Sequence, residues 1–271
     1  MTITATPPDA DLAQRYAEDG VVHLTSILDR DEIDTLRDAF MAQVTSDSSL
    51  GHDDGVPKDD ILARYPRFIH PHRHPELEVG RLTRRYMLDR RILDRVEAMI
   101  GPVNGAQSMF YFKPPTARGQ AMHQDNLFLQ SHPETCIAVW IAIDRVDDEN
   151  GGLQMVPRSH TFELICPGDA DPETSFSKQA IHLPDGMSTE QTVMEPGDAL
   201  FFHGSMVHGS GPNRSADRFR RSLIFHYVPQ SSVEMAKFYL PLLSPSGEEI
   251  RVTESTEGGV CGDGWVPAGP H

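Results

Sequence analysis

Two segments of the chain carry side chains that bind transition metals in proteins. The first contains His123 and Asp125, and the second contains His208, 85 positions after His123. Two histidines and one carboxylate are the ligand set of mononuclear non-haem iron(II) sites, where they fill one face of an octahedron and leave the other face for a cosubstrate and oxygen. If the first segment is extended, the side chains of His123 and Asp125 point to the same side. The sequence therefore predicts an iron(II) site, although His-x-Asp alone arises easily by chance among 13 histidines.

Other histidines compete for a role at a metal. His203 lies five residues before His208, at the end of a predicted strand, and we interpret it as structural or as a neighbour of the site. His226 alternates with Ser222 along another predicted strand, so its side chain could point inward. A hydrogen-bonded core histidine is the simpler interpretation of His226.

A further group of histidines lies near residue 70. His70, His72 and His74 occupy alternate positions, which suggests a second metal site, but Pro71 interrupts the segment. We interpret the group as part of an active-site lid or of the wall of a substrate pocket. Arg67 would then reach a cosubstrate or an anionic substrate.

The composition is typical of globular enzymes. Hydrophobic residues make up 38% of the 271 residues, and this length suits one large β domain. The formal net charge of −16 argues against nucleic acid and anionic membrane surfaces as partners. Composition and charge therefore exclude two classes of partner, and the sequence does not predict the oligomeric state.

The sequence shows no targeting or membrane signal. Residues 1–11 lack the basic and apolar regions of a signal peptide, and no apolar run approaches the roughly 20 residues needed to cross a bilayer. Cys136, Cys166 and Cys261 form no spaced pair, which favours reduced thiols. These observations predict a cytoplasmic location.

The predicted elements divide into a helix-rich first third and a strand-rich remainder. Residues 11–18 look helical, and apolar residues recur at helical spacing in the longer segments 31–44 and 75–100. After residue 103, short strands alternate with Pro/Gly turns; the candidates are 107–113, 136–143, 154–156, 191–194, 199–202 and 222–228. Strands at this spacing favour a sandwich or jelly roll. Such a fold would also bring His123 and His208 together at one open end of the roll.

Several motifs resemble those of the phytanoyl-CoA dioxygenase family of iron(II)/2-oxoglutarate oxygenases, which also contains ectoine hydroxylase. The matching motifs are Lys113-Pro-Pro, His123-Gln-Asp ten positions later, Trp140, Asn150-Gly-Gly-Leu, Pro157-Arg-Ser-His160, Pro196-Gly-Asp198, and His208-Gly-Ser-Gly-Pro-Asn213 with Arg220. Each motif alone is weak, but together they are specific. The resemblance covers roughly residues 10–230.

The resemblance implies a mainly β fold with flanking helices, a double-stranded β-helix of the jelly-roll, cupin-like type. Residues 1–271 would form a single domain. Within it, a helix-rich part (10–100) would pack on a core (103–230) that carries the iron site. Residues 231–271 would form a C-terminal extension of unknown role.

The resemblance also implies Fe(II) as cofactor, 2-oxoglutarate and O2 as cosubstrates, and a set of site residues. His123, Asp125 and His208 would hold the metal and serve catalysis. Arg220 would bind the distal carboxylate of 2-oxoglutarate, because a planar guanidinium pairs with a carboxylate through two hydrogen bonds and stays protonated. Other contacts to the cosubstrate would come from Ser210, Ser222, Trp140, Gln107 and Tyr111, among which Gln107 resembles a glutamine of ectoine hydroxylase.

The arginine assignment has two rivals. The spacing from His208 to Arg220 is twelve residues, one more than the commoner spacing in the family. Arg218 is expected in the preceding turn, and Arg221 would face away from Ser222 in a strand. Surface charge is the simpler interpretation of both rivals, so we favour Arg220.

The implied activity is hydroxylation of an unactivated carbon of a small molecule, with succinate and CO2 as coproducts. Halogenating relatives lack the carboxylate ligand, which this chain retains as Asp125. Desaturation or ring closure by the same chemistry stays open. A non-catalytic cupin-like binding or sensor protein is the alternative of another class, but cupins usually carry His-x-His where this chain has Asp125. Phe128 is the expected wall of the substrate pocket.

Overall fold

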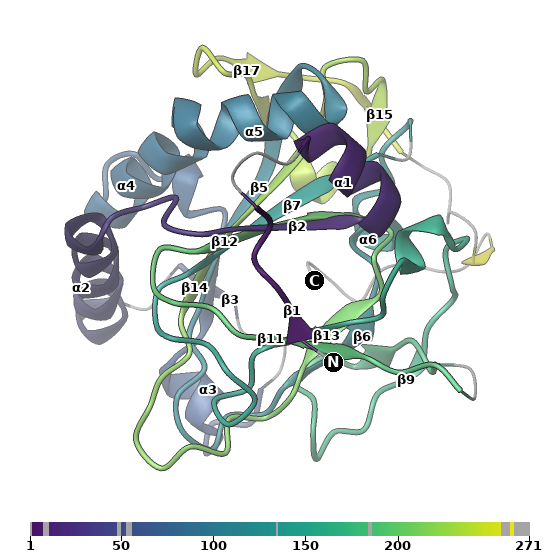
Figure 1. Ribbon diagram of the computed structural model, residues 1–271. Coiled ribbons are helices and arrows are strands. Elements are labelled where there is room, and N and C mark those ends of the chain that lie inside the picture. The colour runs from purple at the N-terminus through teal and green to yellow at the C-terminus, as the bar shows by residue number, and fades with distance from the viewer. Residues whose placement is uncertain are drawn as a thin grey trace.

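The computed structural model consists of two facing β-sheets with helices packed on the outer face of the larger sheet (Figure 1). It describes residues 2–7, 11–47, 50–52, 56–133, 135–183, 186–255 and 261–262. The helices are α1 (Leu12–Asp19), α2 (Arg30–Ser46), α3 (Ile61–Arg64), α4 (Glu78–Met87), α5 (Arg90–Ile100) and α6 (Asp125–Leu129), with 3-10 turns η1 (Pro71–Arg73), η2 (Ser159–Thr161) and η3 (Lys237–Tyr239). The arrangement agrees with the predicted mainly β jelly roll with flanking helices.

The larger sheet has the strand order β17-β16-β5-β14-β7-β12-β2, with β3 and β4 beside β5. Its strands are β2 (Val21–Leu24), β3 (Gly51–His52), β4 (Arg67–Ile69), β5 (Val103–Tyr111), β7 (Ile137–Ala142), β12 (Ala199–His203), β14 (Ser222–Pro229), β16 (Leu242–Leu243) and β17 (Glu249–Ile250). Every residue of β5 and β7 is buried, because helices cover one face and the second sheet covers the other. This two-sided burial explains the continuous apolar sequence of β7, whereas β5 also buries Asn104, Gln107 and Ser108.

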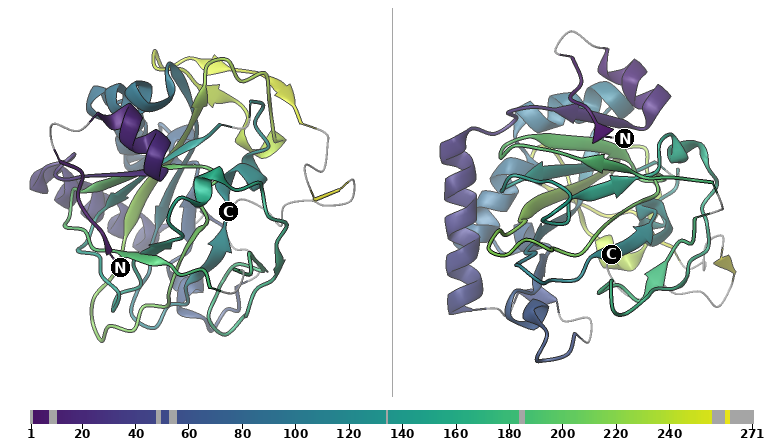
Figure 2. Two further views of the ribbon diagram at one scale, coloured as in Figure 1. Left: turned by 45° about the vertical axis from the view of Figure 1, so that its right-hand side comes forward. Right: turned by 60° about the horizontal axis from the view of Figure 1, so that its bottom comes forward.

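The smaller sheet has the order β1-β11-β8-β13-β6 and forms the other wall of the roll (Figure 2). Its strands are β1 (Thr2–Ile3), β6 (Gln120–His123), β8 (Leu153–Met155), β11 (Glu190–Thr192) and β13 (His208–Ser210). In the antiparallel pair of β6 and β13, His123 lies directly opposite His208. The fold thus brings together the two segments that are 85 positions apart in the sequence. Short strands β9 (Gly168–Asp169), β10 (Gln179–Ala180), β15 (Glu234–Met235) and β18 (Thr253–Glu254) pair outside the two main sheets.

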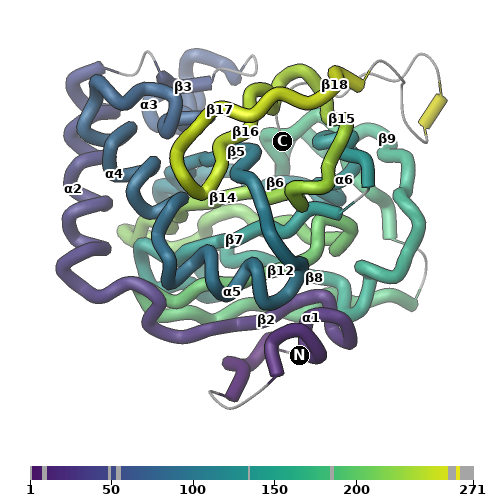
Figure 3. Tube along the Cα trace, turned by 90° about the horizontal axis from the view of Figure 1, so that it is seen from above, coloured from purple at the N-terminus to yellow at the C-terminus, as the bar shows by residue number. Residues whose placement is uncertain are grey.

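The helical layer follows the apolar stripe of the first third of the chain. On α2, Ile33, Leu36 and Phe40 are fully buried, and the Phe40 ring stacks on Phe110 of β5 with 3.8 Å between ring centroids. Helices α4 and α5 lie over the same sheet (Figure 3). The prediction of one helix over 75–100 was wrong: the Asp89 carboxylate accepts a hydrogen bond from the backbone N–H of Arg91 and so caps a second helix.

The C-terminal segment packs against the roll. Leu243 of β16 pairs with Gly105 of β5, and Tyr239 belongs to a buried cluster with Phe128 of α6. No helix in the described part of the chain is long and apolar enough to cross a membrane. That the whole chain forms a single domain, with the boundaries given above, stays a prediction.

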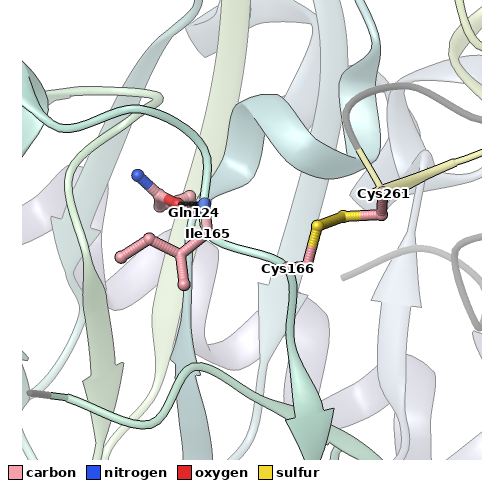
Figure 4. The surroundings of a disulfide bond; sticks show 4 residues. All are labelled: Gln124, Ile165, Cys166 and Cys261. Carbon is pink, nitrogen blue, oxygen red and sulfur yellow. Dashed lines mark hydrogen bonds between the residues drawn. A yellow bond between two sulfur atoms is a disulfide. The ribbon is translucent and has the colours of Figure 1, made fainter.

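The prediction of three reduced thiols was wrong. Cys166 and Cys261 form a disulfide with a Cα–Cα distance of 5.5 Å (Figure 4). The two residues are 95 positions apart, so sequence spacing carried no sign of the pairing. Cys136 keeps its thiol in the core, where burial raises its pKa well above the usual value. The expected cytoplasmic location rested in part on three reduced thiols, and the disulfide removes that support.

Candidate metal and carboxylate site

Three side chains predicted as metal ligands converge inside the roll. One ligand atom from each of His123, Asp125 and His208 lies within 4.8 Å of the others, and all three residues are buried. Oδ1 of Asp125 is 3.6 Å from Nε2 of His123 and 3.5 Å from Nε2 of His208. Within the described residues, this is the one group of histidine, cysteine or carboxylate side chains close enough to hold a metal ion.

Hydrogen bonds fix the orientation of both imidazoles. Nδ1 of His123 lies 2.8 Å from the carbonyl oxygen of Ala121, and Nδ1 of His208 lies 2.9 Å from that of Met206. A carbonyl oxygen can only accept, so each Nδ1 carries the proton and each Nε2 offers a lone pair toward Asp125. Burial also lowers the pKa of His208 to about 4, which keeps its ring neutral at physiological pH. Two imidazoles that present Nε2, together with a carboxylate, fit Fe(II).

The segment between the two first ligands is not a continuous strand. Strand β6 ends at His123, and Asp125 begins α6, so the assumption that both lie in one extended segment was only partly right. The intervening Gln124 is fully buried and is held at both ends of its amide: Oε1 accepts from the N–H of Ile165 at 2.8 Å (Figure 4), and Nε2 donates to the carbonyl of Ser205 at 2.9 Å. Gln124 thereby ties the ligand turn to the segment that leads to His208.

His226 contacts the carboxylate ligand from the opposite sheet. Its Nε2 lies 3.1 Å from Oδ2 of Asp125, and both side chains are 1% exposed. The alternation with Ser222 correctly suggested that His226 points inward. Its interpretation as a histidine of the core missed the contact, because that contact depends on where the α6 turn crosses β14.

A buried guanidinium marks the other end of the site. Arg220 is 3% exposed; its Nη1 donates to Ser222 Oγ at 3.2 Å, and its Nη2 lies 3.5 Å from Ser210 Oγ. Its guanidinium carbon lies 5.5 Å from the centre of the Trp140 ring, within the range of a cation–π contact. Burial lowers the pKa of Arg220 to about 10, so the side chain stays charged at neutral pH. The structure thus gathers four of the predicted cosubstrate residues.

The rival arginines bind other carboxylates. Arg218 pairs with Asp147 at 2.8 Å and with Glu149 at 2.6 Å. Arg221 pairs with Asp144 at 2.7 Å. These ion pairs lie away from the described cavity, whereas Arg220 lines it.

Lys113 is a functional candidate that the sequence interpretation missed, although its motif was noted. The side chain is 3% exposed, and its Nζ donates to Ser210 Oγ at 2.7 Å and to the carbonyls of Gly211 and Gly151. Burial, followed by the nearby charge of Arg220, holds the pKa of Lys113 well below its usual value. The only signal in the sequence was the lysine at the end of a predicted strand and before two prolines; its burial, which for lysine almost always requires partners, comes from the structure.

One cavity joins the two ends of the site. The three metal-binding candidates and Arg220 line it together with Tyr111, Trp140, Ser210 and Ile224.

Three other residues singled out in the sequence lie outside the lining. Gln107, predicted to touch the cosubstrate, is fully buried opposite His226 and is not part of the lining. The ring of Phe128 lies edge-on to His123, with 6.2 Å between centroids, but Phe128 is not part of the lining either, so its place in a substrate wall stays a prediction. His203, interpreted from the sequence as structural or as a neighbour of the site, is not part of this lining. Its ring nitrogen accepts a hydrogen bond from the N–H of Ser205 at 3.0 Å.

The histidines near residue 70 do not converge on one point. Nδ1 of His72 bonds Ser108 Oγ at 2.6 Å on the helix-covered face of β5, while the exposed His74 bonds Glu76. His70 contacts the ring of Phe238 from the C-terminal segment. Arg67 donates to the hydroxyl of Tyr111 at 3.1 Å, beside the cavity. As far as the structure describes the chain, these histidines therefore form no metal site. Their part in a lid or substrate wall stays a prediction.

We expect His72 to make the fold acid-sensitive. Burial lowers its pKa from 6.5 to about 3, so between these values the unfolded chain binds a proton that the folded chain does not, and stability falls as the pH falls. One such group costs roughly 2 kcal/mol at pH 5 relative to neutral pH. His72→Gln should flatten the dependence of the unfolding free energy on pH between 7 and 4, measured by urea denaturation. His74→Gln is the matched control, and an unchanged slope in His72→Gln would contradict the assignment.

Comparisons with known proteins place the chain in a family. A profile of the family described as "Phytanoyl-CoA dioxygenase (PhyH)" matches residues 16–222. The peroxisomal phytanoyl-CoA dioxygenase of Mus musculus is 27% identical over 78% of this chain and 66% of its own length. The phytanoyl-CoA dioxygenase of Arabidopsis thaliana is 31% identical over 48% of this chain and 46% of its own length. The chain thus matches no more than about two thirds of these curated relatives.

Solved structures share the fold. The epimerase SnoN in complex with Fe3+, alpha ketoglutarate and nogalamycin RO superimposes with a TM-score of 0.64 at 23% identity, over 82% of this chain and 84% of that one. The alpha ketoglutarate dependent carbocyclase SnoK gives a TM-score of 0.63 at 22% identity, over 86% and 88%. With the profile match, the chain belongs to the phytanoyl-CoA dioxygenase family of iron(II)/2-oxoglutarate-dependent oxygenases.

Proposed function

We propose that the chain is an Fe(II)/2-oxoglutarate-dependent dioxygenase that hydroxylates an unactivated carbon of a small-molecule substrate. The observation that carries the proposal is one cavity lined by buried side chains, with His123, Asp125 and His208 at one end and Arg220 at the other. A metal at the first end and a carboxylate at the second are the two attachment points of 2-oxoglutarate. When bound, iron with 2-oxoglutarate and O2 supplies the oxidation of a C–H bond, with succinate and CO2 as coproducts.

Each residue of the cavity has a distinct role in the proposal. His123, Asp125 and His208 hold the metal through Nε2, Oδ1 and Nε2. Arg220 binds the distal carboxylate of 2-oxoglutarate through its guanidinium, and the hydroxyls of Ser210 and Ser222 complete that pocket. Because the guanidinium is buried, loss of either partner of this pair would leave an uncompensated buried charge, which is costly.

The remaining lining residues shape the pocket. The Trp140 and Ile224 side chains exclude water from the space between metal and guanidinium, and Tyr111 borders the side that faces Arg67. Lys113 positions the Ser210 hydroxyl and adds a donor beside Arg220. The retained carboxylate of Asp125 disfavours halogenation.

The product is a separate question from the oxidation. The neighbouring structures named above include an epimerase and a carbocyclase, so desaturation or ring closure is the alternative outcome on the same site. The substrate is proposed to be a small molecule. The net charge of −16 supports the absence of nucleic acid and membrane partners.

Succinate formation tests the proposal against a binding or sensor protein. Purified chain with Fe(II), 2-oxoglutarate and O2 should form succinate slowly, and a panel of small metabolites should contain compounds that stimulate it. Omission of iron or oxygen should stop the reaction. A chain that neither consumes nor binds 2-oxoglutarate in the presence of iron would be a binding protein of another kind.

A further inference from the structure

We infer that His226 is a positioning residue that selects which oxygen of Asp125 faces the metal. The inference rests on the proposed function, since it concerns the same metal site. His226 Nε2 is 3.1 Å from Oδ2 of Asp125, while Oδ1 faces the Nε2 atoms of His123 and His208 at 3.6 and 3.5 Å. The carboxylate therefore has one oxygen toward a histidine of the other sheet and one toward the two ligand imidazoles.

This division matters for the number of open coordination positions. A carboxylate that binds through both oxygens takes two positions of an octahedron, and with two imidazoles it would leave two. A bidentate 2-oxoacid and O2 together need three. A hydrogen bond from His226 to Oδ2 favours binding through Oδ1 alone, because metal-ligating carboxylates are oriented by the groups that hydrogen-bond them.

The fold gives His226 little freedom to do anything else. It is 1% exposed, and β14 fixes it between Gln107 of β5 and Ala138 of β7. Since Oδ2 of an ionised carboxylate can only accept, Nε2 of His226 carries the proton.

The position along the strand also links the two ends of the site. Arg220, Ser222, Ile224 and His226 occupy alternate positions and are all buried; the first, third and fourth line the cavity, and Ser222 accepts a hydrogen bond from Arg220. One segment thereby carries the guanidinium proposed for the cosubstrate and the imidazole that orients the metal's carboxylate. The register of β14, together with the backbone bonds of Arg220 to Lys113 just before the strand, sets the distance between these two functions.

Metal titration of the apoprotein tests the inference without turnover. His226→Leu removes the donor, and His226→Gln keeps an N–H donor close to the position of Nε2. We expect Co(II) to bind His226→Leu about 10- to 100-fold more weakly than wild type, the usual cost of losing such a partner, and the Co(II) ligand-field spectrum to change. His226→Gln should stay within about threefold of wild type, with the wild-type spectrum.

His72→Leu is the matched control, because His72 is equally buried and bonds Ser108 on the other face of β5. It should bind Co(II) like wild type, and thermal melting of each apoprotein reports whether it is folded. Wild-type affinity in His226→Leu would overturn the inference, and so would equal weakening in both His226 variants, which would show that packing rather than donation matters. Failure of wild type itself to bind Co(II) would instead overturn the proposed function.

A measurement on the unaltered chain covers the case in which the variants do not fold. With 15N-labelled histidine and zinc in the site, NMR distinguishes a proton on Nε2 from one on Nδ1. We expect His226 to carry its proton on Nε2, protected from exchange with solvent. The Nδ1–H tautomer would overturn the inference.

Discussion

His208→Ala is expected to abolish 2-oxoglutarate-dependent turnover and to weaken metal binding strongly while leaving the roll folded. The substitution removes one of three ligands that converge within 4.8 Å, and the remaining pair cannot complete a facial set of three. Succinate formation and Fe(II) binding by the purified variant are the measurements. Circular dichroism should show an unchanged fold, because the Nδ1 bond to Met206 is one contact among the many of β13.

His203→Ala is the control for this prediction. His203 lies at the end of β12 and is five residues from His208, but its Nδ1 accepts a backbone N–H and its ring packs near Tyr16. We expect its loss to leave metal affinity almost unchanged. If His208→Ala turned over normally and His203→Ala were inactive, His203 and not His208 would be the metal ligand.

Arg220→Ala is expected to raise the KM for 2-oxoglutarate by about tenfold to a few hundredfold. A hydrogen bond to a charged group contributes roughly 1.5–3 kcal/mol, and an unpaired buried carboxylate costs at the upper end or beyond. At about 1.4 kcal/mol per decade, this gives the stated range. Iron affinity should barely change, since no metal ligand is removed. Steady-state kinetics at saturating iron measures the first quantity and Fe(II) titration the second.

Arg218→Ala and Arg221→Ala provide matched controls from the same segment. Each arginine already pairs with carboxylates outside the cavity, namely Asp147 and Glu149 for Arg218 and Asp144 for Arg221. We expect each control to change the KM by less than about threefold, because neither arginine lines the cavity and a lost contact about 0–1 kcal/mol in size changes an equilibrium by less than about fivefold. A large effect in either control together with a small effect in Arg220→Ala would mean that another arginine binds the cosubstrate.

Much of the architecture was predictable because its signals are local. The apolar period of α2 and the turn-separated strands after residue 103 indicated a helical layer on a β roll. The boundary between α4 and α5 was missed although Asp89 is a good N-cap residue, because the apolar stripe continues across it. Strand alternation also placed Arg220, Ser222 and His226 on one face.

The contacts that cross the roll were less accessible from the sequence. The hydrogen bond from His226 to Asp125 and the burial of Lys113 beside Ser210 depend on how two sheets face each other, which no short-range pattern encodes. The Cys166–Cys261 disulfide joins residues 95 positions apart for the same reason. Gln107 was placed by likeness to another enzyme, and the structure puts its side chain outside the cavity lining.

The most direct test of the central claim is an anaerobic titration of the Fe(II)-loaded chain with 2-oxoglutarate, followed by visible absorption. Chelation of iron by the 2-oxoacid should produce a metal-to-ligand charge-transfer band that saturates at one 2-oxoglutarate per iron. Arg220→Ala should need more 2-oxoglutarate to reach the same band, and His208→Ala should give none. The absence of a band in the wild-type chain, or a full band in His208→Ala, would contradict the site described for this protein.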